Sequence, residues 1–290
     1  MANITLNCPI CSQPMKFTGQ ASYYDRKSKF KTSMYYCKAC NIYYRDIENR
    51  QIVDHFYAAS YVQRENESRF FLARQNFFKF ILTVISKFFQ SRGMTELSSL
   101  TLVDFGSSYG HLLELSKQWG FKAIGIELNE DLIQYCTEKK LIVFRKVDNL
   151  PEKVDIFTLI DSLYYLPNPR EMLLKINVHL KEEGIVVIRI TNRNLYTKLL
   201  GKLLYRGNLN ILGDSIISYS LKSVKILFNL TGFEVIRVIP DFGQGKKLDS
   251  KQKIFYLLTS LLTYLSFKTI ILTPGIIIVG ERLNLKRDEG

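Results

Sequence analysis

The segment that follows residue 103 carries residue types suited to binding a cationic ligand. Asp104 lies near the end of an apolar run, and Gly106 and Gly110 follow it in the series Asp-Phe-Gly-Ser-Ser-Tyr-Gly. Glycines at a strand-to-helix junction let the backbone approach a ligand closely and adopt positive φ angles. The spacing differs from the Gly-x-Gly-x-x-Gly of dinucleotide-binding loops, and an acidic side chain would lie badly beside a pyrophosphate. The segment therefore predicts a site for a positively charged group, such as the ammonium of an amino acid.

Further polar side chains follow the next apolar runs. Glu127 ends the second run, where a carboxylate can accept hydrogen bonds from both hydroxyls of a ribose. Asp148 and Asn149 follow the third run and would lie near a base ring, and Asp161 ends the fourth run, opposite the glycine loop. Each position alone is a weak signal, but their order and spacing together predict a ligand that combines a nucleoside with a cationic group.

These motifs resemble the class I S-adenosylmethionine (SAM)-dependent methyltransferase family over about residues 100–240 and a closing strand near 276–281. The matching segments are Asp104-x-Gly106-x-x-x-Gly110, Gly125-Ile-Glu127, the run 155–161 and the turn 180–184. The resemblance implies SAM as the cofactor. It also implies a set of cofactor-binding residues: Asp104, Gly106, Ser107, Ser108, Gly110, Glu127, Leu128, Asp148, Asn149 and Asp161.

Three residues are candidates for catalytic work at the acceptor. Relatives often place Glu-His before Leu-Pro after the fourth strand, and here Tyr165 occupies the histidine position in Leu-Tyr-Tyr-Leu-Pro. His111 directly follows the glycine loop, and His55 precedes an aromatic pair. Packing is the alternative role for Tyr165, and a solvent-facing ring is the alternative for His111. Methyl transfer needs no hydrolytic triad, because alignment of nucleophile, methyl and sulfur supplies much of the rate.

Four of the five cysteines form two Cys-x-x-Cys pairs, Cys8 with Cys11 and Cys37 with Cys40. This pattern predicts a zinc ribbon, because each pair supplies two thiolates from a tight turn and four ligands complete a tetrahedral site. Such a site leaves no open position, so the zinc would be structural; a redox pair is the alternative. We expect the ribbon to depend on its metal and to have a core separate from the SAM site. Cys136 is expected to be buried and inert.

Alternation of apolar runs predicts a Rossmann-like, doubly wound α/β fold with a mostly parallel seven-stranded sheet behind the ribbon. The predicted domains are a zinc ribbon (1–48), a helical linker or cap (49–98) and a SAM-binding domain (99–290). Strands are expected at 33–37, 42–44, 101–105, 122–127, 141–145, 154–160, 184–190, 233–239 and 276–281. Helices are expected at 66–92, 110–119, 129–138, 170–180 and 221–230.

Two leucine-rich stretches do not belong to the minimal scheme. These helical insertions lie near 195–212 and 250–268. The uncharged run 254–267 is shorter than the roughly 20 residues of a spanning helix, so no transmembrane segment is predicted. A packing helix, a lid, a dimer contact and a peripheral membrane-surface element remain as alternatives.

Charge and length set broad limits on partners. The 290 residues carry a net charge of +13, with the excess in the first and last thirds of the chain. Basic flanks could attract nucleic acid, anionic lipid or a phosphate-bearing substrate, or could simply solvate the surface. The start of the chain shows no export signal, so we expect a cytoplasmic location, where cysteines remain reduced.

The prediction for function is methyl transfer from SAM to a small-molecule acceptor. A zinc ribbon in front of this domain resembles two groups of methyltransferases, one acting on sugars or other small metabolites and the other on ribosomal RNA. The aromatic stretch Phe56–Tyr61 favours the first group, and it would line the acceptor pocket together with residues 195–212. The alternatives are an RNA methyltransferase and a non-catalytic protein that retains the cofactor fold. The sequence does not predict an oligomeric state.

Overall fold

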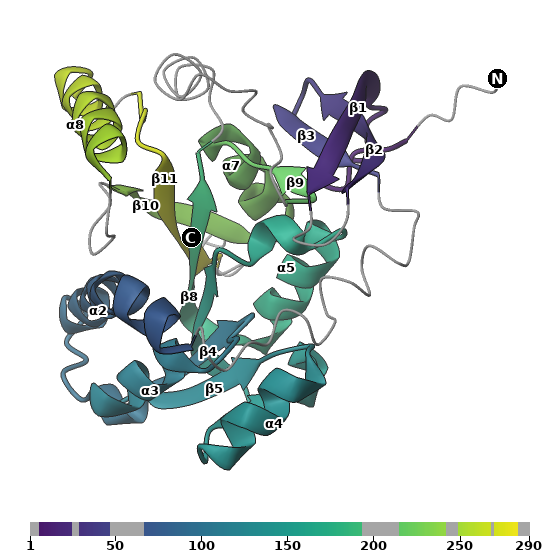
Figure 1. Ribbon diagram of the computed structural model, residues 1–290. Coiled ribbons are helices and arrows are strands. Elements are labelled where there is room, and N and C mark those ends of the chain that lie inside the picture. Colours follow the sequence, from purple (N-terminus) through teal and green to yellow (C-terminus); the bar gives the residue numbers. More distant parts are fainter. Residues whose placement is uncertain are drawn as a thin grey trace, which may run out of the picture.

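The structure is a computed structural model that describes residues 6–24, 29–46, 67–192, 215–241, 249–267 and 270–283. Two sheets organise these residues. Figure 1 shows the larger sheet at the centre with helices on both sides, and the smaller one at a corner of the molecule.

The large sheet has seven strands in the order β10-β11-β8-β7-β4-β5-β6. Neighbouring strands are parallel except where β11 pairs with β10 and β8. From central β4 the chain builds β5 and β6 on one side and then returns to β7 on the other. The bounds are β4 Thr101–Phe105, β5 Lys122–Ile126, β6 Ile142–Phe144, β7 Val154–Ile160, β8 Leu180–Thr191, β10 Phe233–Asp241 and β11 Gly275–Arg282.

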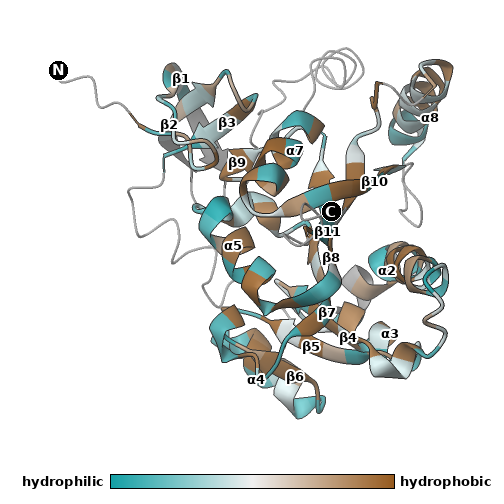
Figure 2. Ribbon diagram, turned by 180° about the vertical axis from the view of Figure 1, so that it is seen from behind, coloured by the Kyte–Doolittle hydropathy of each residue, from teal (hydrophilic) through white to brown (hydrophobic). Residues whose placement is uncertain are grey.

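This strand order creates a crevice between β4 and β7, because the connections leave these neighbours in opposite directions at their carboxyl ends. All five residues of β4 are buried, and so are six of the seven in β7. Strands covered on both faces are continuous apolar runs, which explains why the sequence shows runs here instead of alternation. Figure 2 shows the apolar residues along these central strands.

Helices cover both faces of the sheet. On one face α2 (Glu67–Gln90) and α3 (His111–Gln118) share an apolar cluster with β4, β7, β8 and β11. On the other face α5 (Pro169–His179) and α7 (Leu221–Leu230) pack in a second cluster. A third, smaller cluster joins α3 to α4 (Glu130–Glu138). The fully buried side chains of Ile81, Leu82 and Ile85 show that α2 is a core-packing helix.

The small sheet combines the cysteine-rich segment with a strand from far along the chain. Its order is β1 (Lys16–Tyr24), β2 (Lys29–Cys37), β3 (Ile42–Arg45) and β9 (Ile217–Ser218), all antiparallel. The apolar cluster that contains Ile10 and Ile42 continues without a break to strand and helix residues of the large sheet. The expectation of separate cores is therefore wrong: the ribbon is packed into the main core.

The predicted strands and helices are confirmed with boundary changes of up to four residues, and two strands and the short 3-10 helices were missed. The helix expected to reach residue 180 ends at His179, and β8 begins at once at Leu180. Strands β1 and β9 were not predicted; β9 has only two residues, too few for a periodic pattern. The 250–268 insertion forms α8 (Ser250–Leu265), and the 195–212 insertion lies outside the described residues. Within the described ranges, no helix is long and apolar enough to cross a membrane.

Candidate cofactor pocket and cysteine site

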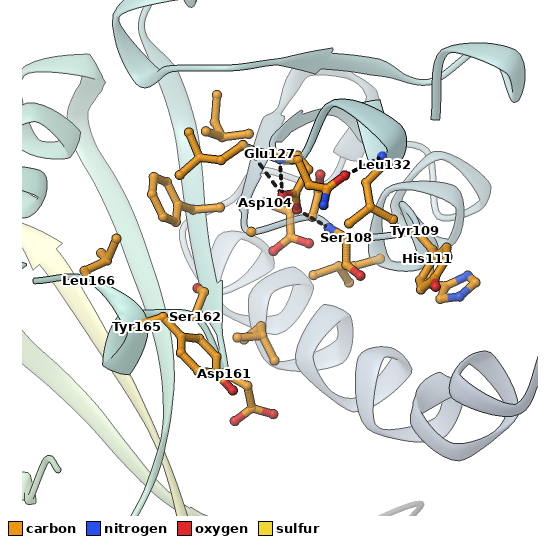
Figure 3. A pocket seen from close by; sticks show the side chains of 18 of the residues that line it. Asp104, Ser108, Tyr109, His111, Glu127, Leu132, Asp161, Ser162, Tyr165 and Leu166 are labelled. Atoms are coloured by element: carbon orange, nitrogen blue, oxygen red, sulfur yellow. Dashed lines mark hydrogen bonds between the residues drawn. The ribbon is translucent and has the colours of Figure 1, made fainter. Parts of the chain in front are cut away.

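A cavity opens at the carboxyl ends of β4, β5 and β7, where the strand order reverses. Figure 3 shows two groups of side chains facing each other across it, with Asp104 and Glu127 on one side and Tyr165 and Asp161 on the other. Most of the predicted cofactor residues line it. These are Asp104, Gly106, Ser107, Ser108, Glu127, Leu128 and Asp161.

The glycine loop fits closely against its neighbours. Gly106 has φ +79°, and a Cβ atom there would lie 2.9 Å from Cβ of Ser162, which follows β7. Gly110, the N-cap of α3, has φ +76°, and its Cβ would lie 2.4 Å from Cδ1 of Leu141. Both positions need glycine for conformation and for space. Cys136 is buried, as predicted, and its thiol donates a hydrogen bond of 3.3 Å to the carbonyl of Ser108, so it supports the loop from behind.

Asp104 is a buried carboxyl group held beneath the loop. It is 6% exposed, and the hydroxyl of Thr158 donates a 2.7 Å hydrogen bond to its Oδ1. Burial raises the pKa of Asp104 to about 7; the Thr158 hydrogen bond and Arg74 oppose this effect, and the charge of Glu127 adds to it. A bound cation would favour the ionised carboxylate. The site therefore fits a ligand with a positive group, and poorly fits an anion.

Glu127 lies at the end of β5 with its carboxylate turned toward the glycine loop. Its Oε2 accepts a hydrogen bond from the N–H of Ser108 at 2.9 Å, and its Oε1 accepts from Leu128 and Asn129 at 2.8 and 3.0 Å. These three bonds hold the carboxylate in place. A carboxylate has about four acceptor sites, so about one remains, on Oε2, for a ligand in the cavity. The geometry fits an acceptor for a ribose hydroxyl.

Asp161 belongs to a chain of ion pairs at the opposite wall. Its carboxylate pairs with the guanidinium of Arg189 on β8, and with Nη2 of Arg74 on α2 at 3.2 Å. Arg189 in turn pairs with Asp241 at 2.7 Å. Burial would lower the pKa of Arg189, but the two carboxylates hold it above its ordinary value. The charge of Asp161 is thus balanced within the protein, and this residue can order the cavity wall without needing a cationic ligand.

The wall of the cavity around Tyr165 is aromatic and apolar. Tyr165 lies in a short 3-10 helix, Leu163–Tyr165, and packs edge-on against Tyr164 with ring centroids 4.6 Å apart. Ile216, just before β9, lines the same wall. His111 also lines the cavity; it is 8% exposed and packs against the ring of Phe71.

The remaining predicted residues lie elsewhere. Asp148 and Asn149 form the exposed 3-10 helix Val147–Asn149 and do not line the cavity, and Asp148 pairs with Lys175 at 3.5 Å. Gly110 supports the loop from behind. His55 and the aromatic stretch Phe56–Tyr61 lie outside the described residues.

Among the lining residues that the sequence analysis missed are Arg74, Asn129, Leu132 and Ile216. Asn129 and Leu132 follow Glu127 by two and five residues, so proximity could have indicated them, whereas Arg74 and Ile216 carry no local signal.

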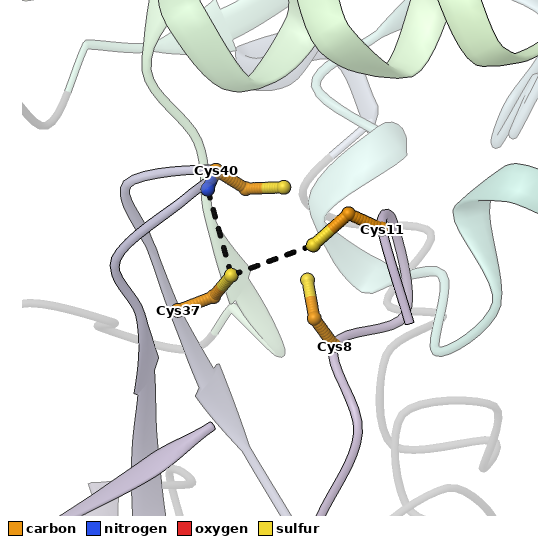
Figure 4. A group of neighbouring side chains, drawn as sticks. All are labelled: Cys8, Cys11, Cys37 and Cys40. Carbon is orange, nitrogen blue, oxygen red and sulfur yellow. Dashed lines mark hydrogen bonds between the residues drawn. The ribbon is translucent and has the colours of Figure 1, made fainter. Parts of the chain in front are cut away.

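The four paired cysteines converge on one point (Figure 4). Their Sγ atoms all lie within 4.8 Å of one another, and those of Cys11 and Cys37 are 3.7 Å apart. A tetrahedron with Zn–S bonds of about 2.3 Å has edges of about 3.8 Å, so the donor set fits zinc. Each pair is followed by a residue with positive φ, Ser12 at 60° and Asn41 at 55°, which makes the two turns similar.

Burial raises the pKa of Cys8 to about 12 and also raises that of Cys40. Burial acts in the same direction on Cys11, but hydrogen bonds from the backbone of Gln13 and from the other cysteines outweigh it and lower the pKa of that thiol. Without a metal, Cys8 and Cys40 are therefore neutral thiols. Zinc would have to displace their protons on binding, which makes metal affinity depend on pH.

Comparison with known proteins agrees with this architecture. A family model described as a methyltransferase domain matches residues 72–238, more than half of the chain. The chain belongs to the methyltransferase domain family. Its fold is that of the class I SAM-dependent enzymes, as the strand order shows.

Individual relatives are more distant. A ubiquinone biosynthesis O-methyltransferase of Methylococcus capsulatus is 31% identical over 117 residues, which are 37% of this chain and 49% of that protein. The chain thus matches about half the length of this relative. The magnesium protoporphyrin IX methyltransferase of Synechocystis PCC 6803, solved with bound SAH, aligns with a TM-score of 0.53 at 13% identity over 81% of this chain and all of that one. A SAM-dependent methyltransferase of Clostridium acetobutylicum aligns at 14% identity and a TM-score of 0.48 over 81% and 99%.

Proposed function

We propose that this protein transfers the methyl group of SAM to a hydroxyl of a small-molecule acceptor. The observation that carries the proposal is the cavity at the β4–β7 switch point, which places Asp104 and Glu127 opposite Tyr165. One side offers two carboxylates and a glycine loop, which suit a cofactor with a cationic group and a ribose. The other side is aromatic and apolar, which suits a small organic acceptor.

The cofactor assignment distributes roles among residues of the cavity. Asp104, Ser107, Ser108 and the loop glycines surround the methionine part, and Glu127 with Leu128 holds the ribose. Asp148 and Asn149 do not line the cavity, so we assign the contact with the adenine to Asn129 and Leu132, which do. Asp161 orders the wall through its two arginine partners.

The acceptor is held on the side of Tyr164, Tyr165 and Ile216. When bound, SAM supplies a methyl carbon already activated by its sulfonium, so the protein mainly has to align the acceptor oxygen. The hydroxyl of Tyr165 positions that oxygen, and His111 is the candidate for accepting its proton. The relative that methylates oxygen in ubiquinone biosynthesis supports a hydroxyl acceptor. His55 stays a candidate for the same side of the pocket.

Zinc in the cysteine site would act through structure. The N–H of Arg45 in β3 donates to the carbonyl of Ile216 at 2.8 Å, and the N–H of Ile216 donates to the carbonyl of Tyr164 at 2.9 Å. One residue thus connects the ribbon to the acceptor wall by two backbone hydrogen bonds. The hydroxyl of Ser220 adds a 3.5 Å contact to the carbonyl of Asn41, beside the second cysteine pair. We assign the metal the role of fixing this wall.

The experiment that tests the cofactor site compares two glycines with the same backbone conformation. Gly106 and Gly93 both have φ +79°, but only at Gly106 would a side chain collide with a neighbour, Ser162, which lines the cavity with it. At Gly93 there is nothing within 4 Å of the Cβ position. Gly106→Val should therefore weaken SAH binding by about 10³-fold, on the order of 4 kcal/mol, whereas Gly93→Val costs only the backbone strain and leaves binding intact. Titration calorimetry measures both.

A second measurement addresses the acceptor. Transfer of labelled methyl from SAM should occur to small phenols or sugar hydroxyls and not to RNA. Absence of SAH binding by the wild type, or equal binding by the two glycine variants, contradicts the cofactor site. Labelling of RNA alone contradicts the small-molecule acceptor while leaving the cofactor site in place.

A further inference from the structure

Helix α8 has its apolar side facing outward. The residues buried against the protein are Phe255, Thr259 and Thr263, and the two threonines are fully buried. The exposed side carries large apolar side chains that are 40–69% exposed. They are Ile254 (52%), Leu257 (69%), Leu258 (40%), Leu261 (54%), Leu262 (41%) and Leu265 (66%).

These exposed residues form one stripe. The series 254, 258, 261 and 265 advances by three or four residues, and so do the pairs 257 with 261 and 258 with 262, the spacing that places side chains on the same face of a helix. Past the helix end, Phe267 is 91% exposed and Ile270 is 50% exposed. Isolated exposed leucines are ordinary on a protein surface, but a contiguous set of this size marks a site of contact with a membrane or another protein.

The inward face explains why the helix keeps this orientation. The hydroxyl of Thr263 accepts the N–H of Leu272 at 3.0 Å and donates to the carbonyl of Thr259 at 2.7 Å. The N-terminus is fixed by a capping box between Asp249 and Gln252. Of these bonds, the one from Leu272 leaves the helix, and it holds the threonine side against the chain that leads into β11. The leucine side cannot turn inward without breaking it and exposing the two buried threonines.

The charges near this face indicate which partner covers it. Residues 250–267 contain two lysines, Lys251 and Lys253, both exposed near the N-terminal end, and no carboxylate. The whole chain carries a net charge of +13. An apolar stripe with lysines at its border is the arrangement of helices that lie in the headgroup region of an anionic bilayer. Sixteen residues make about 24 Å of helix, which is too short to span the hydrocarbon core.

We propose that α8 binds the surface of an anionic phospholipid bilayer, with its axis along the membrane plane and the leucine stripe inserted. Figures 1 and 2 show α8 standing at the edge of the molecule, with apolar residues along it. In the sequence the helix lies between β10 and β11, and the strand ends that it connects, Asp241 and Gly275, pair beside Thr191 at the carboxyl end of β8. Membrane attachment at this edge would bring the cavity near molecules that partition into the bilayer.

The test measures cosedimentation of the full chain with vesicles of phosphatidylcholine alone and of phosphatidylcholine with phosphatidylglycerol. The wild type should bind the anionic vesicles and release from them at high salt. Leu257→Ser with Leu261→Ser should lower the partition coefficient by about tenfold. Lys251→Ala with Lys253→Ala should lower it by about fivefold for each lysine, on anionic vesicles only.

The matched control replaces exposed apolar residues on another helix. Leu174 and Val178 of α5 are 44% and 62% exposed, and Leu174→Ser with Val178→Ser should leave vesicle binding unchanged. Thermal unfolding followed by circular dichroism checks that all three double variants are folded. The proposal is overturned if the wild type does not bind anionic vesicles, if it binds neutral ones equally, or if the control loses binding as well. It is also overturned if the wild type is a dimer that the leucine variants dissociate, since a second copy would then cover the stripe.

Discussion

The two walls of the cavity are built in different ways. The cofactor wall comes from one short stretch, in which Asp104, the glycine loop and Glu127 lie within 24 consecutive residues. The acceptor wall is assembled from segments far apart in sequence, with Tyr164 touching Ile216 and Ile216 touching Arg45 of the ribbon. A local wall depends on backbone conformation and close packing. An assembled wall depends on everything that holds its distant parts together, including the cysteine site.

Loss of the metal should break the acceptor wall and leave the cofactor wall in place. Cys37→Ser removes one of four ligands from a buried site, and metal binding contributes about 10 kcal/mol or more to the folding of small zinc modules. We expect one zinc per wild-type chain, no zinc in the variant and a loss of several kcal/mol in unfolding free energy. Because the ribbon shares the main core, the melting of the whole chain should shift.

Measuring acceptor and SAH binding in Cys37→Ser separates the effect on the two walls. At a temperature where Cys37→Ser is folded, KM for the acceptor should rise more than Kd for SAH. Cys136→Ala is the control for cysteine content and should keep its zinc, since this residue is remote from the four-cysteine cluster. Elemental analysis that finds no metal in the wild type, or a variant with unchanged KM, would remove the connection between ribbon and pocket.

Removing the hydroxyl oxygen of Tyr165 tests the role of a single atom in the acceptor wall. Tyr165→Phe keeps the ring that packs against Tyr164 and removes only the hydroxyl. If the hydroxyl positions the acceptor, kcat should fall by about 100-fold, the usual size for a positioned acid–base or hydrogen-bonding group. SAH affinity and thermal stability should stay as in the wild type. Normal turnover in Tyr165→Phe together with lower stability in Tyr165→Ala would show that the ring only packs.

Most of the cofactor wall could be predicted from the sequence, whereas only Tyr165 of the acceptor wall could be, and the reason is physical. A parallel strand buried on both faces is a continuous apolar run, so β4 and β7 are visible locally, and the polar residues at their ends follow from them. The link through Ile216 is a pair of backbone hydrogen bonds, which any residue can make, and it leaves no mark in the side-chain pattern. The same holds for Arg74, a basic residue on a helix whose ion pair with Asp161 spans 87 positions.

The separate-core prediction was wrong for a related reason. Small size and paired cysteines argue that a ribbon relies on its metal, and this argument does not exclude packing against a neighbour. Apolar Ile10 and Ile42 are fully buried, and a ribbon alone has too little surface to bury them without the main core. A strand of two residues was enough to extend the ribbon sheet into the other domain.

The smallest expected effect concerns pH and the cofactor wall. Asp104 has a pKa of about 7 in the free protein, mainly because of burial, and binding of a cationic ligand favours its ionised form. Below pH 7 the ligand must therefore remove a proton from Asp104 as it binds. Kd for SAH should rise by up to tenfold for each pH unit below 7 and level off above about 8, since each pKa unit corresponds to about 1.4 kcal/mol. Calorimetry in buffers of different ionisation enthalpy would detect the released proton.

Two variants assign this dependence to one group. Asp104→Asn cannot ionise, so its SAH affinity should be low and independent of pH in this range. His111 lines the same cavity, and His111→Asn should keep the pH dependence of SAH affinity if Asp104 is responsible. A pH dependence that is lost only in the histidine variant would assign it to His111.

The pH dependence of stability checks independently that the pKa of Asp104 is raised in the folded protein. Because the folded carboxyl has a pKa raised from 3.8, ionisation costs the folded state more than the unfolded state, and the free protein should lose stability as pH rises from about 4 to about 7. Asp104→Asn should remove that loss, and its unfolding free energy should exceed that of the wild type at pH 8. The metal site and the acceptor wall should contribute nothing to this difference, which belongs to the cofactor wall alone.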